Sequence, residues 1–268
     1  MRTAADAAEN VTNSRALEIV ARAGFAVSGI LHLLIGVVAI RLAMGGEGKA
    51  DVSGAVQQLG NQPAGPLLLW TSFVACVALA IWQTSDAIFD FEHLPAKKKL
   101  AKKLKAALQA VVYAGLAITF FSFARGAGTD QSSSTSDFTA SMMKAPGGYI
   151  LLLAIGAAVS VTGVVYAIRG FRQSFAKYLR LPASEKARTA VIVLGVAGYV
   201  AKGIALLLVG LLVIMATVKA HPEESTGIDG GLRALRDQPL GGYMLAAVGI
   251  GLICYGIYMI VRARLAKM

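Results

Sequence analysis

Charged residues are scarce in this chain. Asp, Glu, Lys and Arg make up 15% of its 268 residues, and 56% of the residues are hydrophobic. Soluble globular domains carry about 25% charged residues. The mean hydropathy of +0.63 points the same way. The composition leaves no room for a large soluble catalytic domain and indicates an integral membrane protein.

Residues that usually carry chemistry are also few. The chain has two cysteines, Cys76 and Cys254, and both lie inside apolar runs, where a thiol packs as a small hydrophobic group. Two cysteines give no metal-ligand spacing. The motifs G-x-x-x-x-G-K-[ST], H-E-x-x-H, G-x-S-x-G and C-x-x-C are absent. We therefore expect no enzymatic activity, no bound metal and no cofactor.

The sequence does contain long apolar runs. The first extends from Ala21 to Met44, and His32 is its one strongly polar side chain between Ala23 and Ile40. A helix of about 20 apolar residues crosses the hydrocarbon core of a bilayer. This criterion predicts six spans, at about 21–44, 66–90, 106–124, 147–169, 190–217 and 241–262. Residues 1–20 lack the apolar core of a secretory signal, so we expect a cytoplasmic leader and an uncleaved first span.

The spans are arranged in repeats. Three glycines of the first span match three of the fifth at a constant offset of 174 residues: Gly24, Gly29 and Gly36 correspond to Gly198, Gly203 and Gly210. A Pro/Gly break precedes the second span of each unit, as QPAGP at 62–66, APGGY at 145–149 and QPLGGY at 238–243. We predict an all-α polytopic membrane protein with six transmembrane helices in three tandem helical-hairpin repeats, at 21–93, 94–179 and 180–268.

The loop inside each repeat has a pattern of its own. Val52–Leu59 places apolar residues at helical spacing, and Leu232 and Leu235 do so in the last loop. We expect a short amphipathic helix that lies on the membrane surface at 52–59, and a short helix at Leu232 and Leu235. The middle loop, 126–148, is rich in Ser and Thr, and we expect its start to be flexible.

The repeated pattern G-[FY]-x-x-x-G-[IV]-x-x-L-L-x-G and the turn Q-P-[AL]-G resemble a bacterial membrane family catalogued as domain of unknown function 1206. The resemblance covers about residues 20–266 and implies three two-helix repeats. The middle repeat departs from the pattern, since VVYAGLAITFF at 111–121 retains few glycines. The family name carries no activity, so no catalytic residue can be transferred from it.

Basic residues predict the orientation. Six spans put both termini on one side, whose loops and ends hold 18 of the 26 Lys and Arg residues, whereas the other side holds 7 and Lys202 lies within a span. The positive-inside rule then places both termini in the cytoplasm, with the spans in the bacterial plasma (inner) membrane. The net charge of +11 follows from this topology, and we expect no nucleic-acid partner.

Small residues mark predicted helix contacts. Gly24, Ser28, His32 and Gly36 recur every four residues and form one stripe. Such spacing lets helix backbones approach closely. The predicted helix-packing residues are Gly24, Ser28, Gly29, Gly36, Gly198, Gly203 and Gly210. We expect them to pack within the monomer, with a homo-oligomer interface as the alternative.

Three polar residues form a candidate intramembrane site. His32 lies ten residues beyond Arg22, about 15 Å along a helix and so near the bilayer midplane. It could be a proton relay, a quinone contact or a haem ligand, or a neutral imidazole bonded to a Ser or a carbonyl on a neighbouring helix. Lys202 takes the place of Ser28 in the repeat, and could reach the cytoplasmic edge or pair with Asp86.

A basic cluster precedes the third span. Such a cluster next to a span attracts anionic lipid headgroups. The predicted lipid contacts are Lys97, Lys98, Lys99, Lys102, Lys103 and Lys105.

Three functions remain open at this point. The first is a non-enzymatic accessory or scaffold component of a larger bacterial membrane assembly, which fits the missing catalytic groups and the small-residue stripes. The alternative is a small transporter or channel that uses His32, Lys202 and Asp86. A membrane redox protein that uses His32 is the third possibility, and it predicts a bound chromophore.

Overall fold

The computed structural model describes residues 15–89, 96–128 and 130–266. In these ranges the regular structure is helical, and the one strand-like feature is an isolated antiparallel bridge between Leu179 and Ala266. The chain divides into two compact units. The first contains the described parts of residues 1–55 and 130–268, and the second contains those of residues 56–129.

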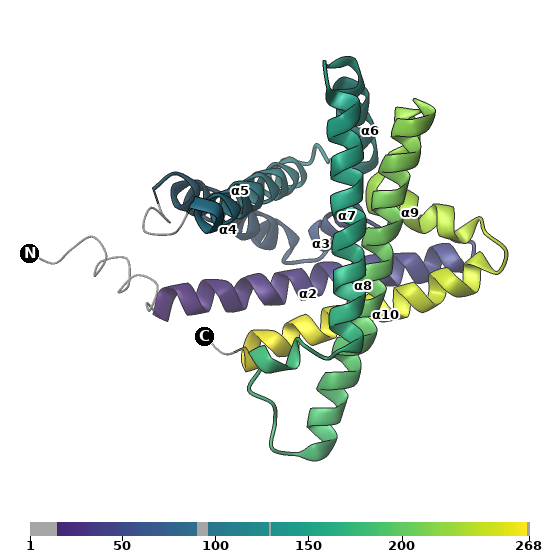
Figure 1. Ribbon diagram of the computed structural model, residues 1–268. Coiled ribbons are helices and arrows are strands. Elements are labelled where there is room, and N and C mark those ends of the chain that lie inside the picture. Colours follow the sequence, from purple (N-terminus) through teal and green to yellow (C-terminus); the bar gives the residue numbers. More distant parts are fainter. Residues whose placement is uncertain (1–14, 90–95, 129, 267–268) are drawn as a thin grey trace, which may run out of the picture. The chain divides into compact units, whose positions relative to one another are not determined.

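Six long helices carry the apolar runs of the sequence (Figure 1). They are α2 (Arg15–Ala43), α4 (Gly65–Phe89), α5 (Ala96–Ala124), α7 (Gly148–Phe171), α8 (Glu185–Lys219) and α10 (Gly241–Leu265). Each has an apolar segment of at least 20 residues with a mean hydropathy between 1.7 and 2.4. About 20 helical residues cross a 30 Å hydrocarbon core, so the all-α, six-span fold class is confirmed.

Three of these helices begin well before the predicted spans. α2 starts at Arg15, α5 starts at Ala96, and α8 starts at Glu185. The added first turns are rich in Lys, Ala, Leu and Glu, which are strong helix formers in a polar environment. Apolar length therefore predicts the membrane segment, whereas helix propensity extends the helix beyond it.

One short helix precedes the second span of each repeat. They are α3 (Val52–Gly60), α6 (Gln131–Lys144) and α9 (Gly227–Arg236). α6 replaces the flexible start that we expected of the Ser/Thr-rich loop. Asp130 caps this helix, because its carboxylate accepts the backbone N–H groups of Ser132 at 3.0 Å and Ser133 at 3.3 Å.

The apolar face of α9 is covered by protein. α9 packs against α8 and α10, and Leu232 and Leu235 are buried. A Cβ added to Gly231 would lie 3.3 Å from the Cβ of Leu208 on α8. The short helix predicted at Leu232 and Leu235 is present, and its apolar side packs against membrane spans.

The second unit consists mainly of α4 and α5, which pack along each other. Phe73 near the start of α4 lies 5.2 Å from Phe121 near the end of α5, measured between ring centroids, so the two helices are antiparallel. Trp70 meets the same Phe121 ring edge-on at 6.0 Å. Phe120 and Ala117 of α5 are buried.

In the first unit, α2 runs beside α10, and α8 contacts both α10 and α7 (Figure 1). The most extensive helix pairs of the chain are α10 with α2, α7 with α8, and α4 with α5. Each pair joins the second span of one repeat to the first span of another. The repeats are thus tied to one another through their spans, in addition to the contact between α8 and α10 within the last repeat.

Paired glycines bring these helices into backbone contact. A Cβ added to Gly29 of α2 would lie 2.7 Å from the carbonyl oxygen of Gly256 on α10, and one added to Gly36 would lie 2.7 Å from that of Gly249. The same arrangement joins α7 to α8, where Gly156 faces Gly210 and Gly163 faces Gly203. On every helix the two glycines stand seven residues apart, two helical turns. The absence of side chains there permits the close approach.

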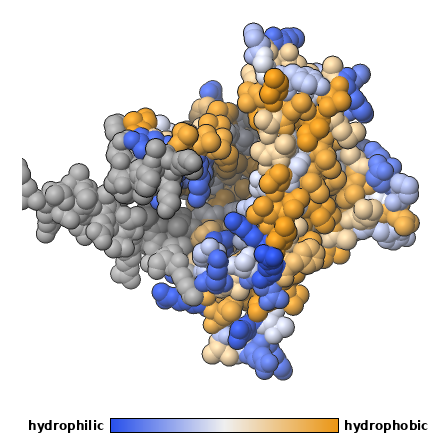
Figure 2. Space-filling model, in the orientation of Figure 1, coloured by the Kyte–Doolittle hydropathy of each residue, from blue (hydrophilic) through white to orange (hydrophobic). Residues whose placement is uncertain are grey.

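The outward side of α7 and α8 is apolar. Figure 2 shows a broad hydrophobic face along these two helices, with hydrophilic residues gathered toward their ends. Exposed side chains on α7 include Ile150, Val161 and Ile168. A helix that is apolar on its exposed side is stable in lipid and not in water.

Candidate functional site

Lys202 is the centre of a polar cluster inside the first unit. It lies at the middle of α8, about 25 Å from Glu185 at 1.5 Å per residue. Its Nζ is 4.6 Å from the centroid of the Tyr255 ring and 5.3 Å from that of Tyr166. Nζ also donates to the Tyr255 hydroxyl at 3.4 Å. The ammonium therefore faces the interior of the bundle, and the aromatic rings of α7 and α10 stabilise it.

His32 joins this cluster from α2. Its Nδ1 lies 2.7 Å from the carbonyl oxygen of Ser28, which can only accept, so Nδ1 carries the hydrogen. Nε2 of that tautomer has a free lone pair. The imidazole is 4.8 Å from the Tyr255 ring, measured between centroids. Tyr255 therefore contacts both His32 and Lys202 and links three helices at one point.

Stacked aromatic rings continue from this point. Phe175 stacks on Tyr199 at 5.1 Å, and Tyr199 meets Tyr255 at 5.5 Å. Tyr199, Tyr255 and Tyr258 are all buried. At the end of the bundle, the guanidinium of Arg262 lies 4.5 Å from the Phe25 ring. These tyrosines could not be predicted as site residues, because single aromatic residues in apolar helices give no signal before their neighbours are known.

Asp86 belongs to α4, and its side chain is outside the described residues. Among the described residues, no ion pair includes Lys202. The Lys202–Asp86 pair stays a prediction.

The predicted packing glycines fall into three groups. Gly29, Gly36, Gly203 and Gly210 form the paired contacts described above. Gly198 lies against the backbone of Tyr255, with an added Cβ 2.7 Å from its amide nitrogen, and so sets the position of that ring. A Cβ added to Gly24 would meet nothing within 4 Å. Ser28 contributes its carbonyl oxygen to His32.

The basic cluster belongs to the first turns of α5. The side chains of Lys97 and Lys98 are outside the described residues. Lys102 and Lys105 are exposed, Lys99 and Lys103 are half-buried, and Nζ of Lys103 donates to the carbonyl oxygen of Ile88 at 3.0 Å. Four ammonium groups within three turns remain close enough to act on one anionic surface.

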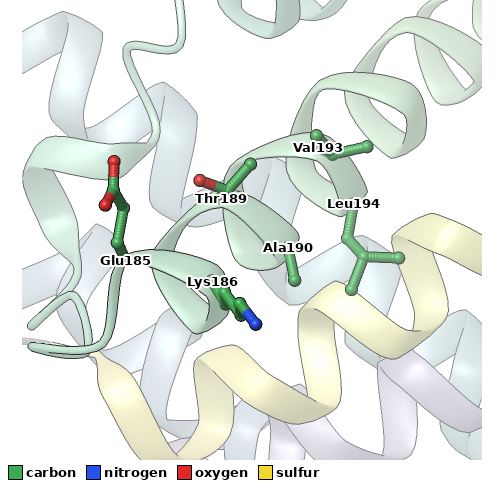
Figure 3. A pocket seen from close by; sticks show the side chains of 6 residues that line it. All are labelled: Glu185, Lys186, Thr189, Ala190, Val193 and Leu194. Atoms are coloured by element: carbon green, nitrogen blue, oxygen red, sulfur yellow. The ribbon is translucent and has the colours of Figure 1, made fainter.

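An open groove lies at the start of α8 (Figure 3). Its volume is about 730 Å³, and Glu185, Lys186, Thr189, Ala190, Val193 and Leu194 line it. Lys186 and Glu185 are at one end, whereas Val193 and Leu194 give the other end an apolar wall (Figure 3). This combination suits a lipid chain with its headgroup more than a polar substrate.

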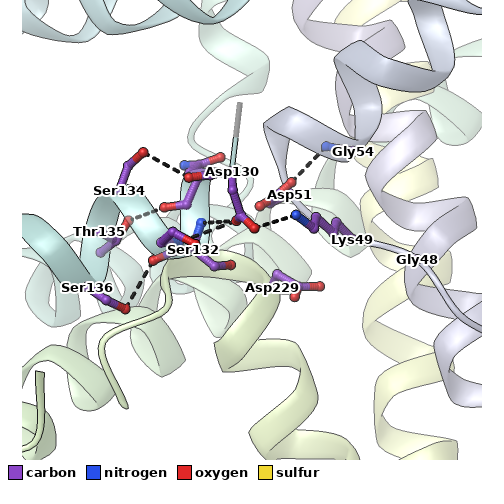
Figure 4. Close-up of polar contacts among 12 residues, drawn as sticks. Gly48, Lys49, Asp51, Gly54, Asp130, Ser132, Ser134, Thr135, Ser136 and Asp229 are labelled. Carbon is purple, nitrogen blue, oxygen red and sulfur yellow. Dashed lines mark hydrogen bonds and ion pairs between the residues drawn. The ribbon is translucent and has the colours of Figure 1, made fainter. Parts of the chain in front are cut away.

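A second polar group connects the loops of the three repeats. We call it the loop cluster, and it contains Gly48, Lys49, Ala50, Asp51, Asp130, Asp229 and Arg233. Figure 4 shows Gly48, Lys49, Asp51, Asp130 and Asp229 of this cluster. Lys49 forms an ion pair with Asp130 at 2.5 Å. The backbone N–H of Ala50 donates to Asp229 at 2.8 Å. The first loop is therefore bonded to both the second and the third.

Arg233 completes the link between the first and third loops. Its Nε donates to Asp229 at 2.7 Å, and its Nη2 donates to the carbonyl oxygen of Gly48 at 2.6 Å. Asp229 is 6% exposed, so this ion pair is shielded from water on one side. This shielded ion pair, whose Arg233 also donates to the Gly48 carbonyl oxygen, holds its partners more firmly than a surface ion pair does.

The second and third loops are also bonded directly. Thr139 donates through Oγ1 to the Ser225 hydroxyl at 3.0 Å, and the Ser136 hydroxyl donates to the Ser225 carbonyl oxygen at 3.2 Å. Thr139 and Ser225 are fully buried. Every pair of loops thus shares at least one hydrogen bond.

Two carboxylates of the loop cluster have opposite pKa shifts. Burial raises the pKa of Asp51, and the nearby Asp229 adds to this, while the Gly54 N–H and Lys49 oppose it. The hydrogen bond from Lys49 lowers the pKa of Asp130. The difference follows from position, because Asp51 is 1% exposed and Asp130 borders solvent. Among the described residues, no group of three or more His, Cys, Asp or Glu side chains could hold a metal ion.

The fold and these clusters define a class of protein: a multi-pass membrane protein with six spans. The sequence profile of the family Domain of Unknown Function (DUF1206) matches this chain three times, at residues 23–90, 104–173 and 197–266. The chain belongs to this family, and the three repeats are confirmed.

One relative is a curated protein of Bacillus subtilis (strain 168), which carries the name "Uncharacterized protein YxxB". It is 31% identical over 243 residues, which cover 90% of this chain and 88% of the relative. No solved structure matches this chain.

Proposed function

We propose that this protein is a non-enzymatic accessory or scaffold component of a larger assembly in the bacterial plasma membrane. The observation that supports this proposal best is the direct joining of the three repeats. Paired glycines join α2 to α10 and α7 to α8, and the loop cluster bonds the first loop to the second and third loops. A component joined in this way offers a fixed surface on which other membrane proteins can assemble.

The partner surface is sought among the exposed apolar side chains. Val37, Val161, Val193 and Ile250 lie on α2, α7, α8 and α10, and each is exposed. A neighbouring membrane span packs on such positions as well as lipid does. A photoreactive amino acid placed at each of the four positions in turn distinguishes the two cases in living cells.

This scan has a clear expected result. A scaffold gives a discrete protein adduct from positions on one side of the bundle and none from the others. A chain surrounded by lipid gives no discrete adduct at any of the four positions, and that result would contradict the proposal. An adduct of twice the chain mass would identify a homo-oligomer.

The orientation is part of the proposal. The distribution of basic residues supports termini in the cytoplasm, with the loop cluster on the outer side. Fusions of a reporter that is active only outside the cytoplasm test it. Activity is expected after Gly46 and Gly126, and no activity after Arg172. Activity after Arg172 alone would reverse the orientation.

A small transporter is the second candidate, because one observation favours it. Lys202, Tyr255 and His32 meet inside the bundle, and ionisable residues at such depth often mark proton or ion pathways. The test is proton or anion flux into liposomes that contain the purified protein. Flux that Lys202→Met abolishes and Lys219→Met preserves would support transport. Equal flux in protein-free liposomes would exclude it.

Anionic lipids are the remaining proposed partner. Each Lys near an anionic surface contributes about 1 kcal/mol of attraction. We expect phosphatidylglycerol to stay bound to the protein during native mass spectrometry. Replacement of Lys99, Lys102, Lys103 and Lys105 by Gln should reduce this retention more than replacement of Lys144, Lys219 and Arg236. Equal retention would remove the basic cluster as a lipid site.

A further inference from the structure

Asp51 has a buried carboxylate oxygen without a hydrogen-bond partner. Its Oδ1 accepts the backbone N–H of Gly54 at 2.8 Å and caps α3, whereas its Oδ2 has no partner. The side chain is 1% exposed. Nearly all buried polar atoms in proteins are hydrogen-bonded, and a buried charged oxygen without a donor is costly. The cap explains one oxygen and leaves the other unexplained.

Two further oxygens near this position are in the same state. The side-chain oxygens of Gln131 and Ser132 are buried and have no partner. Both residues follow Asp130 at the start of α6, and Figure 4 shows Ser132 beside Asp130 in the loop cluster. Asp51, Gln131 and Ser132 thus each have a buried side-chain oxygen without a hydrogen-bond partner.

The charges around Asp51 are also unbalanced. The groups that face it are Lys49 from its own loop, Asp130 from the start of α6, and Asp229 from α9, which is paired with Arg233. Asp51, Asp130 and Asp229 oppose Lys49 and Arg233, so three carboxylates face two cations. One positive charge is missing, and the orphaned atom belongs to the most deeply buried carboxylate.

We infer that the loop cluster is a proton-binding site, in which Oδ2 of Asp51 holds the proton. The proton comes from the aqueous phase and forms one O–H bond on this oxygen. The cluster then has equal numbers of positive and negative groups. The neutral acid is also a hydrogen-bond donor, which a carboxylate is not.

The environment of Asp51 supports this inference. Burial raises its pKa, and the carboxylates of Asp229 and Asp130 act in the same direction. A folded-state pKa above the unfolded value means that the native protein binds the proton more tightly. The resulting stabilisation is complete below the unfolded pKa and is lost as the pH rises through the folded pKa.

Infrared difference spectroscopy tests the proton directly. Spectra of the wild type and of Asp51→Asn, both in lipid nanodiscs, are recorded over a pH series that begins at the ordinary pKa of an aspartate, about 4, and rises above it. The wild type should show the carbonyl band of a protonated carboxylic acid, which shifts in heavy water and is absent in Asp51→Asn. Asp237→Asn is the matched control, because this aspartate is exposed and lies outside the loop cluster, and it should keep the band.

Thermal unfolding provides a second readout of the same site. The unfolding temperature of the wild type, relative to that of Asp51→Asn, should fall as the pH rises above the ordinary pKa of an aspartate, because the buried carboxyl ionises only in that direction of pH. Asp51→Asn keeps a neutral side chain with donors and should fold. If it does not, isotope-edited spectra of labelled aspartate in the wild type still report the band.

Three results would overturn the inference. The first is a protonated band that disappears over the same pH range in which exposed aspartates ionise. The second is a band that Asp130→Asn removes and Asp51→Asn keeps. The third is a stability that depends on sodium and not on pH when sodium replaces choline, since that would identify a metal cation in place of the proton.

Discussion

The paired glycines make the sharpest prediction. A Cβ added to Gly36 would lie 2.7 Å from the carbonyl oxygen of Gly249, 2.8 Å from Cγ1 of Ile253 and 2.9 Å from its amide nitrogen. Two of these three atoms are backbone, so no side-chain rotation relieves the overlap. Gly36→Ala must therefore push α2 away from α10.

The cost can be estimated from packing data. A radial gap of about 0.5–1 Å forfeits a quarter to a half of the dispersion energy between the facing atoms. Overpacked substitutions cost about 1–3 kcal/mol in well-packed proteins. We expect Gly36→Ala to lower the free energy of unfolding by that amount.

Gly24→Ala is the matched control on the same helix. Its added methyl group would meet nothing within 4 Å, and Ala is about 1 kcal/mol more favourable than Gly in a helix interior. Gly24→Ala should therefore leave stability unchanged or raise it. Both variants are compared by thermal denaturation in one detergent, followed by circular dichroism. Equal stability of Gly36→Ala and Gly24→Ala would refute the backbone contact.

Three further predictions concern the two polar clusters. Tyr255→Phe keeps the ring and removes one hydroxyl, so it should lower the free energy of unfolding by about 1 kcal/mol, against about 3–5 kcal/mol for Tyr255→Ala; equal losses would show that the ring is unimportant. Arg233→Gln should cost about 1–3 kcal/mol in thermal denaturation, because Asp229 stays buried without its ionic partner; no loss would mean that this pair does not hold the loops. Because Lys49 lowers the pKa of Asp130, the stabilisation by this pair is present above the unfolded pKa and lost as the pH falls through the folded one. Lys49→Met should remove this acid sensitivity, and unchanged melting curves would contradict it.

Much of the fold could be predicted from the sequence. Apolar runs of about 20 residues have one solution in a bilayer, because every backbone polar group must be bonded within its own helix. The constant offset between Gly29 and Gly203, and between Gly36 and Gly210, gave the repeats. The pairing of the spans could not be predicted. The seven-residue glycine spacing that joins α2 to α10 occurs equally in α7 and α8.

The candidate site was only partly predictable. His32 and Lys202 were noticed because polar residues are rare in apolar runs. Tyr255, which contacts both, could not be distinguished from other aromatic residues of its helix. Asp51 belongs to a polar loop that would be exposed in isolation, and its burial depends on contacts with two distant loops. The flexible start expected for the Ser/Thr-rich loop was wrong, because Asp130 supplies a helix cap.

The central claim is that this chain is a fixed component of a larger membrane assembly. Native mass spectrometry of the protein, released from its own membrane in polymer-bounded lipid particles without detergent, tests it most directly. The account predicts a stoichiometric complex that contains this chain and a second membrane protein, and that persists in Lys202→Met. A wild-type chain recovered only as a monomer with bound lipid would contradict the account.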